Sequence, residues 1–271
     1  MAANSYPNSH NMKSPGSPKT KTDTSWGGVA DWYQEHLEGD DTYHAQVIAP
    51  NLMRLLGPKK GMRILDLGCG EGYFARLIHK SSAHVVGVDI AKPLIEAAKK
   101  QSPDIEYHVA SAENLVFSKD AHFDEVICVL ALQNMEKLDV VLKECARVLK
   151  SGGRCIFVLN HPAFRIPRRS SWGWDEDEKT QYRRIDGYLS ASRAEIDMAP
   201  GIAKEKGGGE TTWSFHRSLQ DHMKAFANVG FVISRLEEWI SHKKSEKGPR
   251  SVAEDTARKE FPLFLAIEVR K

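Results

Sequence analysis

The residues with the clearest chemical potential form a glycine-rich turn. Residues 66–72 read Asp-Leu-Gly-Cys-Gly-Glu-Gly and end the apolar segment Met62–Leu67. Glycines spaced as GxGxG let a ligand approach the backbone closely, and Asp66 can orient an ammonium group or an ordered water there. This carboxylate suits a zwitterionic amino acid and would repel a diphosphate. The dinucleotide fingerprint GxGxxG is not met, because Tyr73 occupies the position of its third glycine.

Two further polar groups follow apolar segments of the same kind. Asp89 ends the segment His84–Asp89, where a carboxylate suits the two hydroxyls of a ribose. Residues 111–113 (Ser-Ala-Glu) follow Ile105–Ala110 and can offer a hydroxyl and a backbone N–H to an adenine edge. Together these groups describe a nucleoside that carries an amino-acid tail. The alternative is that Asp89 caps the next helix and that residues 111–113 form an ordinary loop.

Regular alternation of strands and helices must position these groups. The predicted strands are Met62–Leu67, His84–Asp89, Ile105–Ala110, Phe123–Leu132, Arg154–Leu159, Phe231–Leu236 and Pro262–Arg270. Helical patterns separate most of them, and the pattern from Leu138 to Val148 stops at residues 150–153 (Lys-Ser-Gly-Gly). Such βα repeats predict a parallel sheet with helices on both faces. A charged loop without a strong helical pattern precedes the last strand, which is therefore expected to pair antiparallel.

Residues 161–210 interrupt the alternation with a long polar stretch, predicted to be irregular. It mixes arginine with aromatic residues, which favours a cover that recognises an anionic or aromatic acceptor. The alternative is a solvated helical face whose acidic residues at 175–178 pair with those arginines. The candidate substrate residues here are Arg168, Arg169, Trp172, Tyr182 and Arg183. His161 directly follows the fifth strand, so it is the candidate general base, although a lone histidine is more often structural.

Composition bounds the class of protein. The chain has 271 residues, 41% hydrophobic and 27% charged, with a net charge of +2, which is ordinary for a globular protein and argues against a general nucleic-acid binder. Its longest apolar run, residues 126–132, is far below the roughly 20 residues of a membrane span. The four cysteines form no CxxC pair, so we expect free thiols in a reducing, cytoplasmic setting and no metal site.

Taken together, these segments resemble a known family. ILDLGCGEG, GVD, ASAEN, FDEVICVLAL and RVLKSGGRCIFV resemble the class I S-adenosylmethionine-dependent methyltransferases, and most closely the methyltransferase type-11 group with its ubiquinone and menaquinone enzymes. The resemblance covers about residues 26–271 and implies a Rossmann-like α/β sheet of order 3-2-1-4-5-7-6, with the last strand antiparallel. The cofactor residues it implies are Asp66, Gly68, Cys69, Gly70, Gly72, Asp89, Ile90, Ser111, Ala112, Glu113, Leu130 and Gln133.

The resemblance also gives a role to the N-terminal region. Residues 1–25 are predicted to be a disordered tail, and apolar spacing between Trp26 and Leu56 predicts two helical segments. In the family this region covers the cofactor, so Trp32 and Tyr33 are candidates for a lid whose aromatic faces attract a sulfonium. Tyr43 and His44 are weaker candidates. The alternative is that these aromatic residues belong only to the core.

The expected reaction is methyl transfer from S-adenosylmethionine, leaving S-adenosylhomocysteine, to oxygen or carbon of a small or medium-sized acceptor. The first alternative is an RNA or protein methyltransferase that uses residues 161–210 as a platform. A nicotinamide-dependent oxidoreductase is disfavoured by Tyr73 and Asp66, and the last alternative is a non-catalytic protein that binds S-adenosylmethionine. The sequence does not indicate the acceptor or the oligomeric state.

Overall fold

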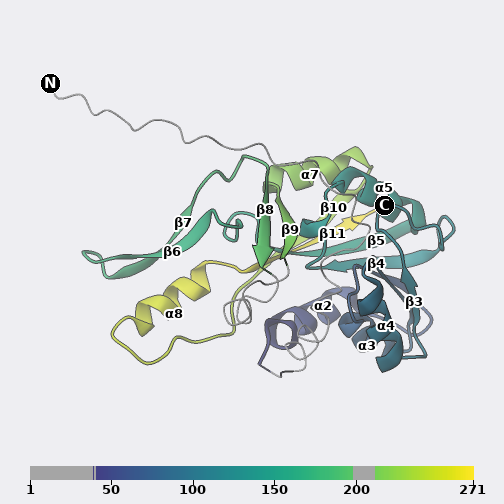
Figure 1. Cartoon of the computed structure of the whole chain (residues 1–271), viewed down its shortest axis with the longest axis horizontal. Helices are drawn as coiled ribbons and strands as arrows, with labels where there is room; N and C mark the ends of the chain where they lie inside the picture. Colours follow the sequence, from purple (N-terminus) through teal and green to yellow (C-terminus); the bar gives the residue numbers. More distant parts are fainter. Residues whose placement is uncertain (1–38, 40, 198–210) are drawn as a thin grey trace.

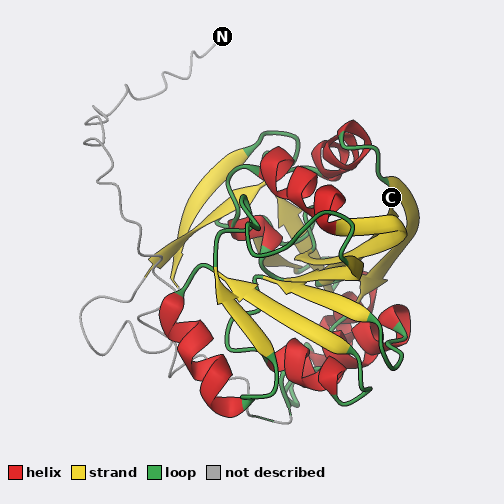
Figure 2. Ribbon diagram, turned by 90° about the vertical axis from the view of Figure 1, so that its right-hand side faces the viewer, coloured by secondary structure: helices red, strands yellow, loops and turns green. Residues whose placement is uncertain are grey.

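A seven-stranded sheet with helices on both faces forms the body of the computed structural model, which describes residues 39, 41–197 and 211–271 (Figures 1 and 2). Its strands are β1 (Arg63–Leu67), β2 (His84–Asp89), β3 (Glu106–Val109), β4 (Phe123–Val129), β5 (Leu149–Asn160), β10 (Val232–Trp239) and β11 (Phe264–Arg270). Their order is β3-β2-β1-β4-β5-β11-β10, and β11 runs antiparallel to both of its neighbours. The predicted sheet order and the antiparallel last strand are therefore confirmed.

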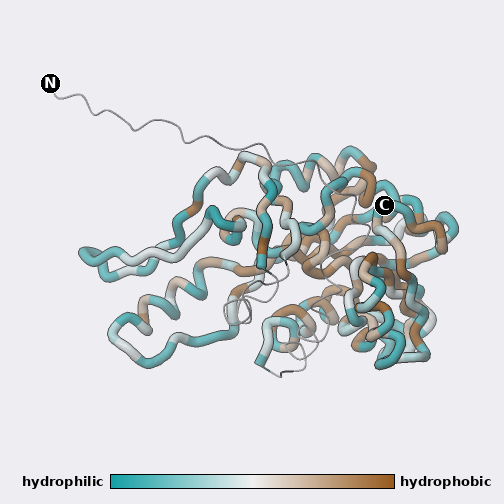
Figure 3. The backbone as a smooth tube through the Cα atoms, viewed as in Figure 1, coloured by the Kyte–Doolittle hydropathy of each residue, from teal (hydrophilic) through white to brown (hydrophobic). Residues whose placement is uncertain are grey.

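Two hydrophobic layers hold this sheet between the helices. The layer on one face includes residues of α2 (Ala49–Leu56), α3 (Tyr73–His79) and α4 (Lys92–Gln101), whereas the other includes α5 (Leu138–Val148) and α7 (Leu219–Asn228). Ile64 and Leu65 are adjacent in β1 and belong to opposite layers, because successive strand side chains point to opposite faces. The central strands β4, β5 and β11 are mainly apolar because both of their faces are buried, and Figure 3 shows brown segments at the centre.

Local sequence signals explain several helix ends. α4 begins with Pro93 in its first turn, where a missing N–H costs nothing. The Ser218 hydroxyl accepts from the Asp221 N–H while the Asp221 carboxylate accepts from the Ser218 N–H, a capping box at the start of α7. The second predicted N-terminal segment is present as one π-helical turn, η2 (His44–Ile48), that continues into α2. The predicted tail and first helical segment lie outside the described residues.

Two predicted boundaries were wrong. The helical pattern Leu138–Val148 is confirmed as α5, but the fifth strand begins at Leu149 instead of Arg154, so residues 150–153 belong to β5, whose register against β4 shifts between Phe123 and Glu125. β4 ends at Val129 instead of Leu132, because Leu130 takes a left-handed conformation (φ +54°) and a short 3-10 helix, η3 (Leu132–Asn134), follows. Both differences come from backbone conformation that apolar patterns do not encode.

The expected irregular stretch after β5 is built from two antiparallel hairpins instead. They pair β6 (Ser170–Asp175) with β7 (Thr180–Ile185), and β8 (Ser192–Asp197) with β9 (Thr211–His216). The alternative of a solvated helical face is wrong as well. Exposure alternates along β7 with a period of two, and Asp175 Oδ1 closes the turn by accepting the N–H groups of residues 177 and 178. The β6–β7 hairpin projects from the body and is largely hydrophilic (Figures 1 and 3).

A helix that the sequence pattern did not indicate, α8 (Ser251–Glu260), lies between β10 and β11 and packs against β7 (Figure 1). Arg250 anchors this contact, since its guanidinium pairs with Glu176 at 2.7 Å and lies 4.4 Å from the centre of the Trp174 ring. The helix is mostly charged, which is why its apolar period is weak. Within the ranges that the structure describes, no helix is long and apolar enough to cross a membrane.

One buried ion cluster ties three strands together at the edge opposite the glycine turn. Arg154 of β5 donates from Nε to Glu125 of β4 (2.7 Å) and from Nη1 to Glu268 of β11 (2.9 Å). Its Nη2 donates to the carbonyl of Leu56 at the end of α2 (2.7 Å). Burial raises the pKa of Glu125 to about 7 despite this partner. The guanidinium therefore compensates two carboxyl groups that are each only 5% exposed.

We expect Arg154→Met to lower the free energy of unfolding by about 3–5 kcal/mol, because it leaves buried carboxylates without their partner. Urea denaturation at pH 7.5 measures the loss. Arg54→Met is the matched control, since Arg54 pairs with Glu237 at the surface, where its own side chain is 52% exposed. Its loss should be much smaller. Equal losses in the two variants would show that the buried cluster is not a main support of the sheet.

Candidate functional site

The glycine turn lies between β1 and α3, at the edge of the sheet where β1, β2, β4 and β5 end; we call this the ligand edge. The N–H groups of Gly68 and Cys69 both donate to the carbonyl of Val88, which fixes the turn against β2. A Cβ on Gly68 (φ +73°) would lie 2.5 Å from the Cβ of Ala131, so packing requires glycine there. A Cβ on Gly70 (φ +56°) would meet no atom within 4 Å. Gly70 is therefore open on the side where a ligand would lie.

Asp89 joins this turn to the end of β2. Its Oδ2 accepts the Gly70 N–H (3.0 Å) and its Oδ1 accepts the Ala91 N–H (2.9 Å). Burial raises the pKa of Asp89, against the lowering effect of these backbone hydrogen bonds. The side chain thus shapes the turn and braces the start of α4, and each oxygen keeps a second lone pair for a hydroxyl. The two predicted roles, ligand contact and helix support, are compatible in this geometry.

Asp66 lies beneath the turn with 1% of its surface exposed. Among the described residues nothing hydrogen-bonds to its Oδ2. Burial, and then the charge of Asp89, raise the pKa of Asp66 to about 7. A buried acceptor without a partner is costly, and a cationic or hydrogen-bonding group in the turn would relieve that cost.

The remaining predicted cofactor residues surround the turn. Cys69 is buried, whereas Ile90 is 46% exposed at the ligand edge. The Ser111 hydroxyl accepts the Glu113 N–H (3.2 Å), and the Glu113 carboxylate pairs with Lys137 (2.8 Å). These loop groups therefore already have partners within the chain. Also at this edge are Gly72, which follows the turn, and Ala112, which packs against the α5 side of the core.

After β4, the chain turns through Leu130, whose carbonyl accepts from Gln133 Nε2 (2.6 Å). The other end of this amide, Gln133 Oε1, is buried, and the described residues offer it no hydrogen bond. Because Leu130 has a left-handed backbone without being glycine, the segment stores strain at the ligand edge. Gln133 therefore presents an unused acceptor beside the place where β4 ends.

The predicted N-terminal residues divide into two groups. Trp32 and Tyr33 lie outside the described residues, so the lid stays a prediction. The Tyr43 ring packs edge-on against Phe264 and His242, and its hydroxyl contacts Ser241 Oγ at 3.2 Å. The His44 ring lies against Tyr73 and Phe74 at the start of α3. Tyr43 therefore contacts the start of β11, whereas His44 contacts the start of α3 next to the glycine turn.

The predicted substrate residues of the β6–β7 region serve mainly that region. Arg183 donates to the Phe164 carbonyl and to Ser170 Oγ, and its guanidinium lies 5.0 Å from the centre of the Trp172 ring. The Tyr182 ring covers Gly173, where a Cβ would lie 2.3 Å from it. Arg168 and Arg169 are exposed. None of these five side chains lines the pocket described below, so the structure does not gather them into one site.

His161 is buried with both ring nitrogens engaged. Its Nε2 lies 2.8 Å from Glu238 Oε1, and its Nδ1 accepts the Ala163 N–H at 3.2 Å. Burial lowers the pKa of His161, while Glu238 acts in the opposite direction. This arrangement supports a positioning role at the end of β5. The role of general base stays a prediction, and in this geometry no ring nitrogen is free to perform it.

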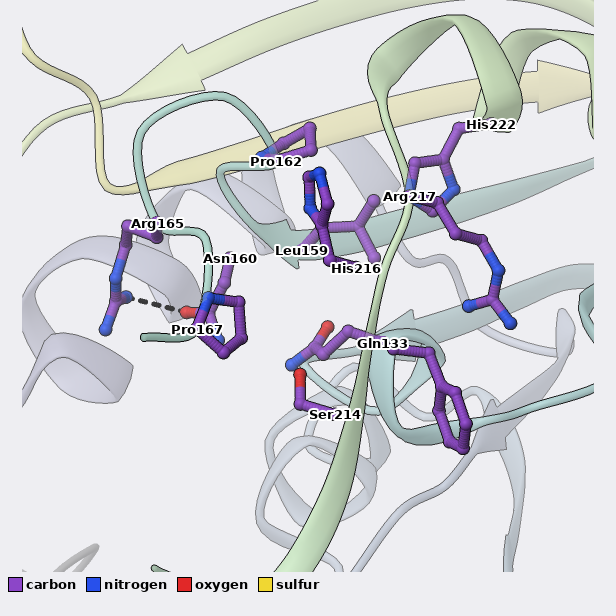
Figure 4. A pocket seen from close by; sticks show the side chains of 11 residues that line it. Gln133, Leu159, Asn160, Pro162, Arg165, Pro167, Ser214, His216, Arg217 and His222 are labelled. Carbon is purple, nitrogen blue, oxygen red and sulfur yellow. Dashed lines mark hydrogen bonds between the residues drawn. The ribbon is translucent and has the colours of Figure 1, made fainter. Parts of the chain in front are cut away.

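A pocket at the ligand edge lies between the end of β5, β9 and the start of α7 (Figure 4). Most of its lining residues are not indicated by the sequence patterns. The residues that line it are Gln133, Leu159, Asn160, Pro162, Arg165, Pro167, Ser214, Phe215, His216, Arg217 and His222. Figure 4 shows Arg165 and Arg217 at opposite sides, with Gln133 and Ser214 between them. The sequence does contain one indication of this pocket, because residues 214–222 place two histidines and an arginine around the start of a helix. Within the described ranges, no group of histidine, cysteine and acidic residues is placed to hold a metal ion.

Comparison with known proteins gives this geometry a family context. Residues 65–157 match the family described as a methyltransferase domain. A ubiquinone biosynthesis O-methyltransferase from Paracidovorax citrulli is 36% identical over 107 residues, which are 38% of this chain and 45% of that protein. The chain thus spans less than half the length of that curated relative.

The fold extends well beyond the matched segment. A crystal structure of an S-adenosylmethionine-dependent methyltransferase from Mesorhizobium loti covers 82% of this chain and 96% of its own, at 28% identity and a TM-score of 0.64. A second structure, from Listeria monocytogenes, has a TM-score of 0.62 over 82% of this chain and 96% of its own; its 24% identity speaks for the fold alone. The sheet is therefore that of the class I methyltransferases, as the sequence predicted.

The raised pKa of Asp66 predicts how the stability of the protein depends on pH. Because the folded pKa (about 7) exceeds the ordinary value of 3.8, the folded state holds a proton that the unfolded state has released. Stability should therefore fall as the pH rises towards 7. Asp66→Asn removes this titration. The free energy of unfolding of the variant minus that of the wild type should therefore be about 2–3 kcal/mol larger at pH 8 than at pH 5.

Urea denaturation at the two pH values, without any ligand, measures this difference. Asp124→Asn is the control. Burial alone would raise the pKa of Asp124, but hydrogen bonds from the Arg63 N–H and from Lys150 lower it. That variant should be less stable than the wild type by the same amount at pH 5 and at pH 8, because a carboxyl group with a lowered pKa is ionised in both the folded and the unfolded state across this range. A constant difference between Asp66→Asn and the wild type would contradict the assignment of a raised pKa.

Proposed function

Since this chain carries a class I S-adenosylmethionine-dependent methyltransferase domain, we propose that it transfers a methyl group from S-adenosylmethionine to a hydroxyl of a small-molecule acceptor. The observation that carries this proposal is the open side of Gly70, flanked by Asp66 and Asp89. A turn with an open backbone approach and two carboxyl groups suits a cationic nucleoside, and it does not suit a pyrophosphate.

The residues present fit the cofactor. Asp89 would accept from the ribose hydroxyls through its remaining lone pairs, while Asp66 Oδ2 would gain a positively charged neighbour. Gly68, Cys69, Gly70 and Gly72 would let the amino-acid tail approach the backbone. Ile90, Ser111, Ala112 and Glu113 would border the adenine, and Leu130 and Gln133 the end nearest the acceptor. No metal is required for this arrangement.

S-adenosylmethionine, when bound, supplies a methyl group already activated by a positive sulfur, so the protein's task is chiefly to position the acceptor and exclude water. A lone pair of the acceptor oxygen forms the new bond as the carbon–sulfur bond breaks towards sulfur, and the acceptor hydroxyl loses its proton. Gln133 and the pocket beside it would orient that oxygen. The proton would pass to water or to a neutral histidine of the pocket.

Two observations favour a small acceptor over RNA or protein. The curated relative from Paracidovorax citrulli is named for O-methylation in ubiquinone biosynthesis, a small-molecule pathway. In the β6–β7 hairpin, the Arg183 guanidinium is already in contact with Phe164, Ser170 and Trp172. The arginine at the centre of the hairpin is therefore not available to bind RNA or a protein. Of the predicted acceptor residues, His44 with Trp32 and Tyr33 would close the cofactor side of the site, and Tyr43, which packs on Phe264 beneath Arg165, would border the acceptor side.

The cellular setting follows from the thiols. Cys69, Cys128, Cys145 and Cys155 are all free and buried. Unpaired cysteines are typical of proteins that work in a reducing compartment. We therefore place this activity in the cytoplasm.

We expect Gly70→Ala to weaken S-adenosylhomocysteine binding at least tenfold, because the new methyl group occupies ligand space. Gly57→Ala is the matched control. Gly57 ends α2 at φ +52°, close to the +56° of Gly70, and its added Cβ would also meet nothing within 4 Å. Both variants therefore carry similar backbone strain, roughly 1 kcal/mol, and only Gly70 adjoins the ligand. Calorimetric titration distinguishes them, and equal affinities would remove the turn from the cofactor site.

The reaction itself is tested with methyl-labelled S-adenosylmethionine and fractionated metabolite extracts. Label should enter a small molecule with the wild type and with Gly57→Ala, and not with Gly70→Ala. Tight cofactor binding without transfer to any fraction would identify a non-catalytic binding protein. Label in RNA or protein would replace the small-molecule acceptor.

A second expectation concerns His161. His161→Gln should lower the free energy of unfolding by about 1–3 kcal/mol, because it breaks the contacts with Glu238 and the Ala163 N–H. Its kcat should stay within tenfold of the wild type, and cofactor affinity should not change. A loss of roughly 10²–10⁴ in kcat in a folded variant would instead assign it the predicted role of general base.

A further inference from the structure

We propose that the pocket between β5, β9 and α7 binds the carboxylate of an organic acid, so that the methyl acceptor is an anion held by Arg165. This inference rests on the proposed function only in identifying the occupant of the pocket as the acceptor. The pocket's affinity for a carboxylate follows from the chain's own residues and can be tested without any turnover.

Arg165 is the central observation. Its guanidinium donates from Nη1 to Asn160 Oδ1 (2.6 Å) and lies 5.4 Å from the centre of the Phe264 ring. Within residues 41–197 and 211–271, the Arg165 guanidinium forms no ion pair, and its side chain donates no other hydrogen bond. Burial is the main influence on the guanidinium and lowers the pKa of Arg165. A guanidinium with one face on an aromatic ring and several unused N–H donors is arranged to receive a planar anion side-on.

Unpartnered polar atoms gather in the same pocket. Three of its lining residues have a buried nitrogen or oxygen to which the described residues offer no hydrogen bond: Gln133 Oε1, Arg217 Nη1 and His222 Nδ1. Buried polar atoms are normally paired, so such a group of exceptions points to a missing ligand with both donors and acceptors. A hydroxylated acid has this combination.

The charge of the lining selects the sign of that ligand. Arg165 and Arg217 line the pocket, and no aspartate or glutamate is among the described lining residues. Burial, and then Arg217, lower the pKa of His222 to about 4, so this histidine adds no charge near pH 7. The pocket is therefore electropositive because of its arginines alone.

A single negative charge matches this pocket better than a phosphate dianion. Arg217 lies within the electrostatic influence of Asp139, Glu136 and Asp221, and its Nη2 already donates to the carbonyls of Met135 and Glu136. Among the described residues, no carboxylate influences Arg165; Tyr43 and Arg183 are the titratable or charged groups that do. One uncompensated guanidinium calls for one carboxylate.

The arrangement also orients the acceptor. Arg165 and Gln133 lie on different sides of the pocket in Figure 4, and Gln133 belongs to η3, the short helix after β4 at the ligand edge. A carboxylate at Arg165 would therefore place the far end of the molecule towards Gln133 and the cofactor. The acid group would serve as the anchor, and the hydroxyl at the other end would be methylated.

The test titrates the full-length protein with sodium acetate, sodium phosphate and acetamide while the ring signals of His222 are followed by NMR. The His222→Gln variant assigns those signals. Acetate should cause a saturable shift with a Kd in the millimolar range, and acetamide and phosphate should not. Arg165→Gln should weaken acetate binding at least tenfold. Arg184→Gln is the control, because Arg184 is an exposed hairpin arginine paired with Asp186.

The outcomes separate this inference from the proposed function. If S-adenosylhomocysteine binds but acetate causes no saturable shift, or if Arg165→Gln and Arg184→Gln behave alike, the carboxylate site is refuted while the methyltransferase proposal stands. A response to phosphate in place of acetate also refutes it. If acetate binds as expected and S-adenosylhomocysteine does not, the site stands and the proposed function fails. Among acceptors found by labelling, acids should exceed their amides at least tenfold in kcat/KM, and Arg165→Gln should abolish that preference.

Discussion

The hydrogen bond from the Gly70 N–H to Asp89 holds the ligand edge in its shape. It connects the loops after two neighbouring parallel strands, and the Ala91 N–H on the other oxygen extends the connection to α4. No side chain packs on Gly70, so the hydrogen bond to this carboxylate helps to keep the open turn in place. Holding two carboxyl groups at this edge makes their ionised forms less favourable, because burial raises the pKa values of both Asp66 and Asp89. Such unfavourable ionisation is typical of sites that exist to hold a ligand.

The two halves of the edge have opposite electrostatic character. At the glycine turn, Asp66 is buried and Asp89 partly buried, and neither has a basic partner among the described residues, which suits a cationic cofactor. At the pocket, Arg165 is half-buried and has no acidic partner within the described ranges, which suits an anionic acceptor. Because each ligand would compensate the charge that the fold leaves unbalanced, the same arrangement would favour binding both together. The proposed reaction therefore depends on charged side chains, the carboxyl groups at the glycine turn and Arg165 at the pocket, that are not needed for packing.

The segment after β5 shows how an insertion can support a site without contributing its most conspicuous residues. Within the β6–β7 hairpin, Arg183 stacks on Trp172, and Arg250 at the start of α8 stacks on Trp174 and pairs with Glu176 of the hairpin. A two-stranded hairpin is marginal in isolation, so these contacts are needed to hold it away from the body. The second hairpin then brings β9 across the end of β5, where Ser214, His216 and Arg217 complete the pocket.

The sequence by itself determined the strands, the glycine turn and the acids that flank it, because apolar period and strand-end chemistry are local properties. The sheet order came from the resemblance to the class I methyltransferases. The sequence could not determine that Arg183 stacks on Trp172, that His161 faces Glu238, or that Arg165 has no carboxylate partner among the described residues. Those facts depend on which distant segments meet, since β10 supplies Glu238 and β9 closes the pocket from more than 50 residues away in sequence. Only the tertiary structure decides which side chains satisfy one another and which remain available to a ligand, because pairing inside a fold is settled by position in space rather than by order along the chain.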